Sequence, residues 1–85
     1  MYTIIISESA FKELKKIQKV YVNKIQIAID RLSENPRPVG CKKLQGTNEN
    51  LYRIRIGDYR VVYSIEDKIK IVDIRQIGHR KDIYR

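Results

Sequence analysis

The chain has 85 residues, of which 42% are hydrophobic and 33% charged, and its formal net charge is +8. This length predicts one domain, residues 1–85, with a single hydrophobic core. The apolar fraction excludes a disordered chain, and no apolar stretch approaches the roughly 18 residues of a membrane span. The excess of basic residues favours an anionic partner such as nucleic acid, the ribosome, an acidic protein or an anionic membrane surface.

The N-terminal sequence MYTIIISES lacks the basic leader and the long apolar region of a signal peptide, so we expect a cytoplasmic protein. Cys41 is the only cysteine, which excludes an intramolecular disulfide and a cysteine-rich metal site. His79 is the only histidine and cannot form a metal site by itself. We therefore expect neither a metal ion nor an organic cofactor.

The first half of the chain predicts one strand and two helices. Tyr2–Ile6 is β-branched and aromatic and predicts a strand. Ser7 or Ser9 can cap a helix that follows, whose apolar face contains Ala10, Leu14 and Ile17. A second helix is predicted from about Val20 to Ser33, where apolar residues recur at helical spacing, and Pro36 prevents its continuation.

The second half predicts a loop and three strands. Glu34–Asn50 contains both prolines and two of the four glycines, which is typical of a surface connection. The predicted strands are Leu51–Ile56, Tyr59–Ile65 and Lys68–Ile77, and the letters EDK form the turn between the last two. The order β-α-α-β-β-β predicts an α+β fold, with an N-terminal helical hairpin packed on one face of a small, twisted, mostly antiparallel sheet.

A two-residue turn at Gly57-Asp58, of type II′, determines how the first two of these three strands pair. It places Arg55 opposite Arg60 and Arg53 opposite Val62. Because side chains alternate along a strand, these residues share one face of the sheet. The other face is apolar and must be the one that the helices cover; its residues are Tyr52, Ile54, Ile56, Tyr59, Val61 and Tyr63.

Two arginines directly across from one another destabilise a sheet by a few tenths of a kcal/mol to about 1 kcal/mol. One interpretation is that each arginine pairs with a carboxylate, such as Asp58, Asp73 or Glu66. The other is that this face binds phosphates, for which the planar guanidinium group is well suited. The hairpin contains only one acidic residue, which favours the phosphate-binding interpretation.

The C-terminal sequence GHRKDIYR adds His79, Arg80 and Tyr84 to this inventory. A lone histidine is more often incidental than chemical. An imidazole, a guanidinium and a phenol near an arginine-lined face nevertheless suit metal-free RNA cleavage. In that reaction a base removes the proton of the ribose 2′-hydroxyl, cations stabilise the phosphate, and an acid protonates the departing oxygen.

Four segments, NP, KKLQG, YRIRIGDYRVVY and IGHRKDIYR, resemble toxins of the RelE/ParE superfamily, and most of all its RelE-like branch. The resemblance covers essentially the whole chain and implies the same fold order. It implies a type II toxin that cleaves mRNA in the ribosomal A site, without metal, by attack of the ribose 2′-hydroxyl on the adjacent phosphate. It also implies a cognate antitoxin that forms a hetero-oligomer with the toxin. The +8 charge predicts that this antitoxin is acidic and covers either the helices or the arginine face.

The resemblance also implies a role for individual residues. Arg53 and Arg55 match two basic strand residues and would bind RNA phosphates. Arg60 would hold and stabilise the phosphate, and Arg80 would stabilise the transition state or assist the leaving group. Tyr84 would stack on a base or transfer a proton. Arginine stays protonated and is a poor general base where RelE has lysine, so His79 and Tyr84 are the candidates for that role.

A second interpretation belongs to a different functional class. ParE-like toxins share the fold but poison DNA gyrase by binding it, without nuclease chemistry. Such proteins usually lack the set formed by Arg60, Arg80 and Tyr84, which favours the ribonuclease here.

Overall fold

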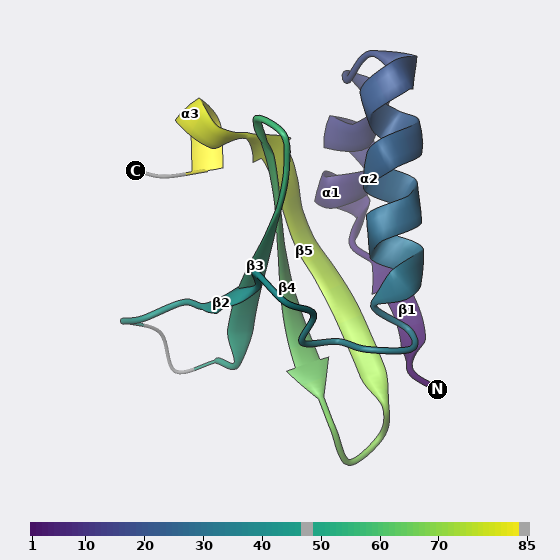
Figure 1. Ribbon diagram of the computed structural model, residues 1–85, viewed down its shortest axis with the longest axis vertical. Helices are drawn as coiled ribbons and strands as arrows, with labels where there is room; N and C mark the ends of the chain where they lie inside the picture. Colours follow the sequence, from purple (N-terminus) through teal and green to yellow (C-terminus); the bar gives the residue numbers. More distant parts are fainter. Residues whose placement is uncertain (47–48, 84–85) are drawn as a thin grey trace.

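A computed structural model of the chain, which describes residues 1–46 and 49–83, has a five-stranded sheet with helices on both of its faces (Figure 1). The elements in chain order are β1 (Thr3–Ile6), α1 (Glu8–Lys15), α2 (Lys19–Arg31), β2 (Lys42–Lys43), β3 (Leu51–Ile56), β4 (Tyr59–Glu66), β5 (Ile71–His79) and α3 (Arg80–Ile83). This arrangement confirms the predicted α+β fold. No helix in the described residues is long and apolar enough to cross a membrane.

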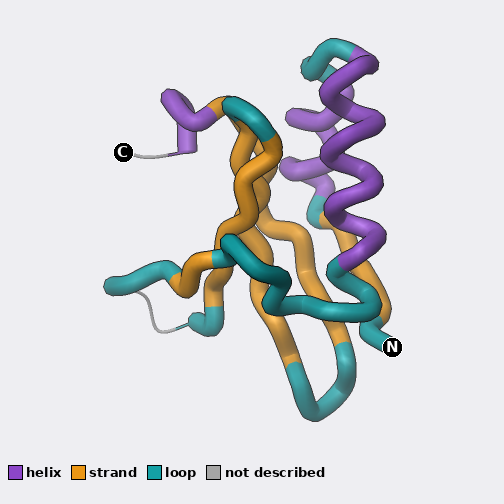
Figure 2. Tube along the Cα trace, in the orientation of Figure 1, coloured by secondary structure: helices purple, strands orange, loops and turns teal. Residues whose placement is uncertain are grey.

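The strands lie in the order β1-β5-β4-β3-β2, and the paired strands are visible in Figure 2. β1 is parallel to β5, and the other three pairings are antiparallel. α1 and α2 lie together on one face of the sheet, whereas α3 lies beyond the end of β5 on the other side (Figure 1). The predicted helical hairpin on one face of a mostly antiparallel sheet is therefore confirmed.

Helix α1 begins where the sequence allowed two caps. Ser7 is the N-cap: its backbone is extended, and its side-chain oxygen accepts a hydrogen bond from the backbone N–H of Ala10 at 3.2 Å. The same hydroxyl lies 3.2 Å from the carbonyl oxygen of Arg75, to which it can donate. Ser7 therefore caps α1 and joins its start to strand β5.

The last strand differs from its prediction. β5 begins at Ile71, not Lys68, and continues to His79. The turn before it spans residues 67–70 and ends at Lys70, which has a left-handed φ of 56°. Because this turn extends beyond the predicted EDK turn, the strand begins later in the sequence than predicted. An irregularity between Val62 and Tyr63 also shifts the pairing of β4 with β5. Such a shift changes which β5 residues face the helices and cannot be recognised from alternation alone.

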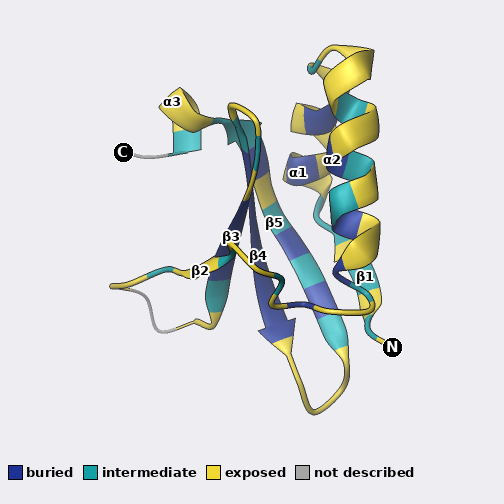
Figure 3. Cartoon of the chain, in the orientation of Figure 1, coloured by how far each residue is buried: buried dark blue, intermediate teal, exposed yellow. Residues whose placement is uncertain are grey.

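The core lies between the helices and the sheet (Figure 3). The helical layer contributes Ala10, Leu14, Ile25, Ile29 and Leu32, and the strands contribute Tyr52, Ile54, Val61, Tyr63, Ile65, Val72, Ile74 and Ile77. Four residues of the predicted apolar face of the hairpin therefore belong to this core, and the other two, Ile56 and Tyr59, pack against it. The buried Tyr63 satisfies its hydroxyl by donating to the carbonyl oxygen of Pro36 at 2.7 Å, which fixes the chain just after α2.

An ion pair between Arg37 and Asp67 connects two loops at the end of the molecule remote from α3. The two Arg37 Nη atoms donate to the two carboxylate oxygens of Asp67 at 3.2 and 2.9 Å, and the Tyr2 hydroxyl donates to Asp67 Oδ1 at 2.7 Å. These hydrogen bonds, with that from Arg37 the stronger influence, lower the pKa of Asp67 to about 2. The contact ties the loop after α2 to the β4–β5 turn.

We expect Asp67→Asn to lower the thermal unfolding midpoint by a few degrees at pH 6. An unfolded aspartate has a pKa of about 3.9, so the lowered pKa stabilises the fold above about pH 4, and the effect is lost as the pH falls towards 2. Thermal melts from pH 7 to pH 2 should show the two proteins converging over that interval. The neighbouring exposed Glu66→Gln variant is the control, and a constant difference at all pH values would contradict the prediction.

Candidate active site

The β3–β4 hairpin pairs as predicted. Gly57 has φ of 60°, the left-handed value that the first central position of a type II′ turn requires. Arg55 pairs with Arg60, and Arg53 pairs with Val62. The three arginines therefore lie on the face opposite α1 and α2, here called the outer face. β2, which the sequence did not predict, adds Lys42 directly across from Arg53 on the same face.

The outer face is less open than the sequence suggested. Arg55 is exposed, but Arg60 is only 5% exposed and Arg53 only 9%. Part of the cover is α3, which packs against β4 and β5. Gly78, the partner of Arg60 in β5, lies close to α3. A Cβ at Gly78 would lie 3.3 Å from Cδ1 of Ile83, the last residue of α3. The absence of a side chain at Gly78 thus avoids a close contact with Ile83 of α3.

Arg60 is held by the main chain of the turn before it. Its Nη1 donates to the carbonyl oxygens of Gly57 at 2.9 Å and Tyr59 at 3.0 Å. Its Nε is buried and has no hydrogen-bond partner among the described residues. Burial lowers the pKa of Arg60, and the positive charges of Arg55, Arg53 and Arg80 lower it further. A fixed buried cation with an unused donor can bind an anionic oxygen.

Arg80, the first residue of α3, is also attached to this turn. Its backbone N–H donates to the carbonyl oxygen of Asp58 at 2.8 Å, and its Nε lies 3.8 Å from Asp58 Oδ1. The other aspartate considered for the hairpin, Asp73, is bonded to Arg75 at 3.1 Å. Asp58 thus contacts Arg80 and Asp73 contacts Arg75, and the cluster of Arg53, Arg55, Arg60 and Arg80 keeps an excess of positive charge.

The structure does not bring His79 together with the arginines. His79 pairs with Tyr59, so its side chain lies on the helix side of the sheet, and the two rings meet edge to face at 5.7 Å. Its Nδ1 accepts a hydrogen bond from the backbone N–H of Lys81 at 3.2 Å. Arg60 is the next residue after Tyr59 and points to the opposite side. Tyr84 lies outside the described residues.

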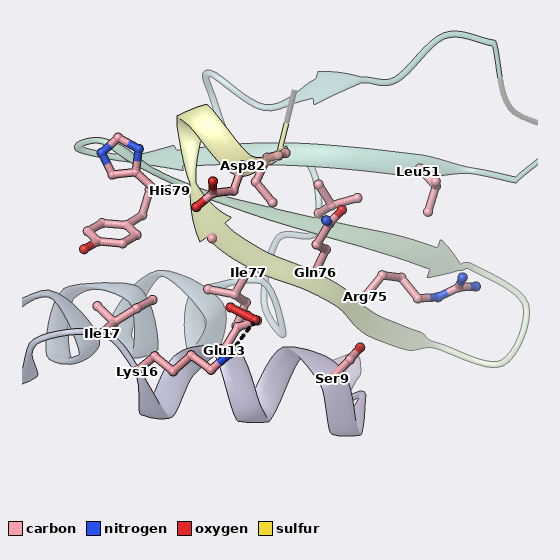
Figure 4. A pocket seen from close by; sticks show the side chains of 14 residues that line it. Ser9, Glu13, Lys16, Ile17, Leu51, Arg75, Gln76, Ile77, His79 and Asp82 are labelled. Carbon is pink, nitrogen blue, oxygen red and sulfur yellow. Dashed lines mark hydrogen bonds and ion pairs between the residues drawn. The ribbon is translucent and has the colours of Figure 1, made fainter. Parts of the chain in front are cut away.

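A cleft of about 760 Å³ lies along the part of β5 that extends past the end of β1, and Figure 4 shows the side chains that line it. Glu13 of α1 and Lys16, the residue that caps its C-terminus, line one side, and Asp82 of α3 lines the other. Glu13 and Lys16 neutralise one another through a contact of 3.3 Å. None of the four clustered arginines lines this cleft, so it is separate from the cationic cluster.

The described residues offer no metal-binding cluster: residues 1–46 and 49–83 contain no group of three His, Cys, Asp or Glu side chains placed to hold an ion. What the arrangement provides is four guanidinium groups from β3, β4 and α3, held partly by main-chain carbonyls. Such a set can bind a phosphate and stabilise negative charge that develops on it.

Comparison with known proteins agrees with this arrangement. Residues 4–84 match the family described as the ParE toxin of type II toxin–antitoxin system, parDE. Toxin RelE of Mycobacterium tuberculosis is 34% identical over 85 residues, which cover 99% of this chain and 87% of that protein. Toxin RelG of the same organism is 33% identical over 85 residues, covering 99% of this chain and 97% of RelG.

Solved structures give the same result. A chain in the crystal structure of the archaeal RelE–RelB complex from Pyrococcus horikoshii superposes with a TM-score of 0.83 at 33% identity, covering 95% of this chain and 97% of that one. The isolated Escherichia coli RelE toxin gives 0.79 at 26% identity, covering 93% and 84%. The chain therefore belongs to the RelE/ParE family of type II toxin–antitoxin toxins, which confirms the resemblance seen in its sequence.

We expect Arg55→Thr to raise the free energy of unfolding by a few tenths of a kcal/mol to about 1 kcal/mol, because it removes the like charge opposite Arg60. Urea unfolding at low ionic strength measures this change. Arg55→Lys keeps the charge and is the matched control, so it should show no comparable gain. Added salt should narrow the difference by screening the repulsion. A less stable Arg55→Thr protein would show that the pair is not repulsive in the folded state.

Proposed function

We propose that this toxin is an endoribonuclease that cleaves mRNA in the ribosomal A site and so stops translation. The observation that carries the proposal is the convergence of Arg60, Arg80 and Arg55 on the outer face, next to a donor on Arg60 that is unused among the described residues. A positively charged cluster with fixed geometry suits a phosphate whose charge increases during the reaction. The RelE names of its relatives support the same function.

In the proposed reaction the ribose 2′-hydroxyl loses its proton to a base, and its oxygen forms a bond to the adjacent phosphorus. The bond from phosphorus to the 5′-oxygen of the next nucleotide breaks, and that oxygen takes up a proton. The products are a 2′,3′-cyclic phosphate and a 5′-hydroxyl end. In this scheme Arg60 holds the phosphate, Arg80 stabilises the transition state or the leaving oxygen, and Arg53 and Arg55 bind the RNA backbone.

Burial of Arg60 sets a condition on this scheme. At 5% exposure its guanidinium group meets a phosphate only if the chain that covers the outer face moves away. α3 is part of that cover and makes few contacts with the rest of the molecule beyond β4 and β5. A short helix of four residues is a weak independent element, so its displacement costs little. We therefore propose that α3 shifts when RNA binds.

The general base is proposed among two residues. Tyr84 follows α3 in the sequence and thus comes after the segment that covers the arginines. His79 lies on the helix side of the sheet with its Nδ1 occupied by Lys81 N–H. Since a base must lie within hydrogen-bond reach of the proton that it removes, the observed position of His79 favours Tyr84.

A cognate antitoxin is the proposed protein partner, since relatives have been crystallised as RelE–RelB complexes. The +8 charge favours an acidic chain. One surface available to it is the groove between α1 and α2, of about 370 Å³, which is lined by Phe11, Leu14, Lys15, Ile17, Lys19, Val22 and Gln26. The arginine face is the other, and an antitoxin there would compete directly with RNA.

The alternative function, poisoning of DNA gyrase, retains one argument: the family model that matches the chain is named for ParE. The two functions make different demands on the arginines. Gyrase binding requires no phosphate chemistry, so it does not explain why the buried guanidinium group of Arg60 and the exposed one of Arg80 both contact one turn.

We expect the toxin to cut ribosome-occupied mRNA in a translation extract, with 5′-hydroxyl and 2′,3′-cyclic phosphate ends located by primer extension and end analysis. Arg60→Ala and Arg80→Ala should each reduce the cleavage rate by about a hundredfold or more, the usual effect of removing one donor to a developing anion. Glu66→Gln, at the far end of β4, is the control and should cut normally. Tyr84→Ala belongs in the same series.

Two results would contradict this proposal in different ways. Intact message together with blocked DNA supercoiling would favour gyrase as the target. Normal cutting by Arg60→Ala and Arg80→Ala would leave the function in place and refute the assigned site.

His79→Asn should retain cleavage within a few-fold of the wild type. Asparagine offers an oxygen near the position of Nδ1, so the bond from Lys81 N–H is preserved, while the titratable imidazole is removed. Single-turnover cleavage rates measured from pH 5.5 to pH 8.5 test this. General acid or base catalysis usually contributes about 10²–10⁴-fold, so a loss of that size would place His79 in the catalytic machinery.

A further inference from the structure

Both arginines assigned to the phosphate are anchored on the same three-residue segment, the Gly57–Tyr59 turn. Arg60 of β4 donates to the carbonyl oxygens of Gly57 and Tyr59. Arg80 of α3 is bound by Asp58, through its backbone at 2.8 Å and its side chain at 3.8 Å. Two elements that are distant in the sequence thus obtain their relative position from one short turn.

We propose that Asp58 is a positioning residue for RNA cleavage, whose carboxylate holds the Arg80 guanidinium beside Arg60 so that both address one phosphate. This inference rests on the proposed ribonuclease function. The Asp58 carboxylate and the Arg80 side chain are 67% and 55% exposed, so the contact adds little to overall stability. Its effect is on orientation: without it, a long side chain at the start of a one-turn helix has many rotamers available.

The two attachments of Arg80 have separate roles. The hydrogen bond from Arg80 N–H to Asp58 O fixes the backbone where α3 begins, and any residue at position 58 can supply that oxygen. The side-chain contact fixes the guanidinium group and needs a carboxylate. When the rest of α3 moves away from the outer face, the first attachment keeps Arg80 in place as a pivot, and the second keeps its side chain directed at the site.

The carboxylate also has a cost for substrate binding. Its negative charge lies close to the position proposed for the phosphate, and like charges about 6 Å apart in water weaken binding by about threefold. Removing the charge should thus tighten RNA binding while loosening Arg80. A residue that served only the fold would not produce these two opposite effects.

The experiment compares wild type, Asp58→Asn, Asp58→Glu and Glu66→Gln, all confirmed as folded by circular dichroism. Single-turnover cleavage of ribosome-bound mRNA gives the maximal rate and the half-saturating toxin concentration. Asp58→Asn should lower the maximal rate by about ten- to a hundredfold, as expected when a catalytic group is misplaced by about 1 Å. Its half-saturating concentration should fall by about threefold at low salt, and this difference should shrink as salt is added.

The remaining variants complete the test. Asp58→Glu keeps the carboxylate and should recover much of the maximal rate, while Glu66→Gln, which removes the same charge elsewhere, should behave as wild type. A maximal rate for Asp58→Asn within twofold of wild type would overturn the proposal. So would an Asp58→Glu protein as slow as Asp58→Asn.

A second measurement does not depend on cleavage. The exchange rate of the Arg80 Nε proton, followed by nuclear magnetic resonance in the free toxin, should rise several-fold in Asp58→Asn and stay unchanged in Glu66→Gln. An unchanged rate in Asp58→Asn would refute the side-chain anchor. Failure of the wild type to cut ribosome-bound mRNA would instead overturn the ribonuclease function, and with it the role of Asp58 in cleavage.

Discussion

The alternation of side chains along the β3–β4 hairpin is the constraint on which the rest of this structure depends. One pair of strands therefore contributes both to the core and to the cationic cluster, since Ile54 and Val61 face the helices while Arg55 and Arg60 face away. The Gly57 turn fixes that division, because a shift of one residue in the pairing would exchange the faces and place guanidinium groups in the core. The fold and the cationic cluster therefore have the same origin, and neither can change register without the other.

This arrangement is tolerated because the two faces are stabilised separately. The helix side supplies a continuous apolar core, with Tyr63, Ile65 and Val61 almost fully buried in the central strand. The outer face contributes repulsion between like charges and a buried guanidinium group whose pKa is lowered chiefly by burial. Groups that oppose folding yet are held in fixed geometry are typical of functional sites, where a protein gives up stability for chemistry.

The sequence alone predicted the features of this fold that depend on residues close together in the chain. The hairpin register followed from Gly57 and the alternation around it, and the apolar spacing around Ile25 and Ile29 identified the second helix. β2 and α3 were missed because a two-residue strand of lysines and a single helical turn have no pattern of their own; each exists through contact with another element. The side of the sheet on which His79 lies could not be predicted for a similar reason. It depends on β5 extending to residue 79 after a pairing shift opposite Val62.

The sequence predicted the arginines of the candidate site but not the groups that orient them. Residue types revealed the arginines, but the groups that orient two of them are largely main-chain carbonyls of the turn, which no pattern of side chains records. The sequence offered Asp58 as a partner for the hairpin arginines, and only the position of α3 shows that it faces Arg80. A turn that supplies carbonyls to both arginines must keep its length and its left-handed glycine, whatever side chains surround it. In this toxin the geometry of the turn, more than any single guanidinium group, would determine whether the cluster acts as one site.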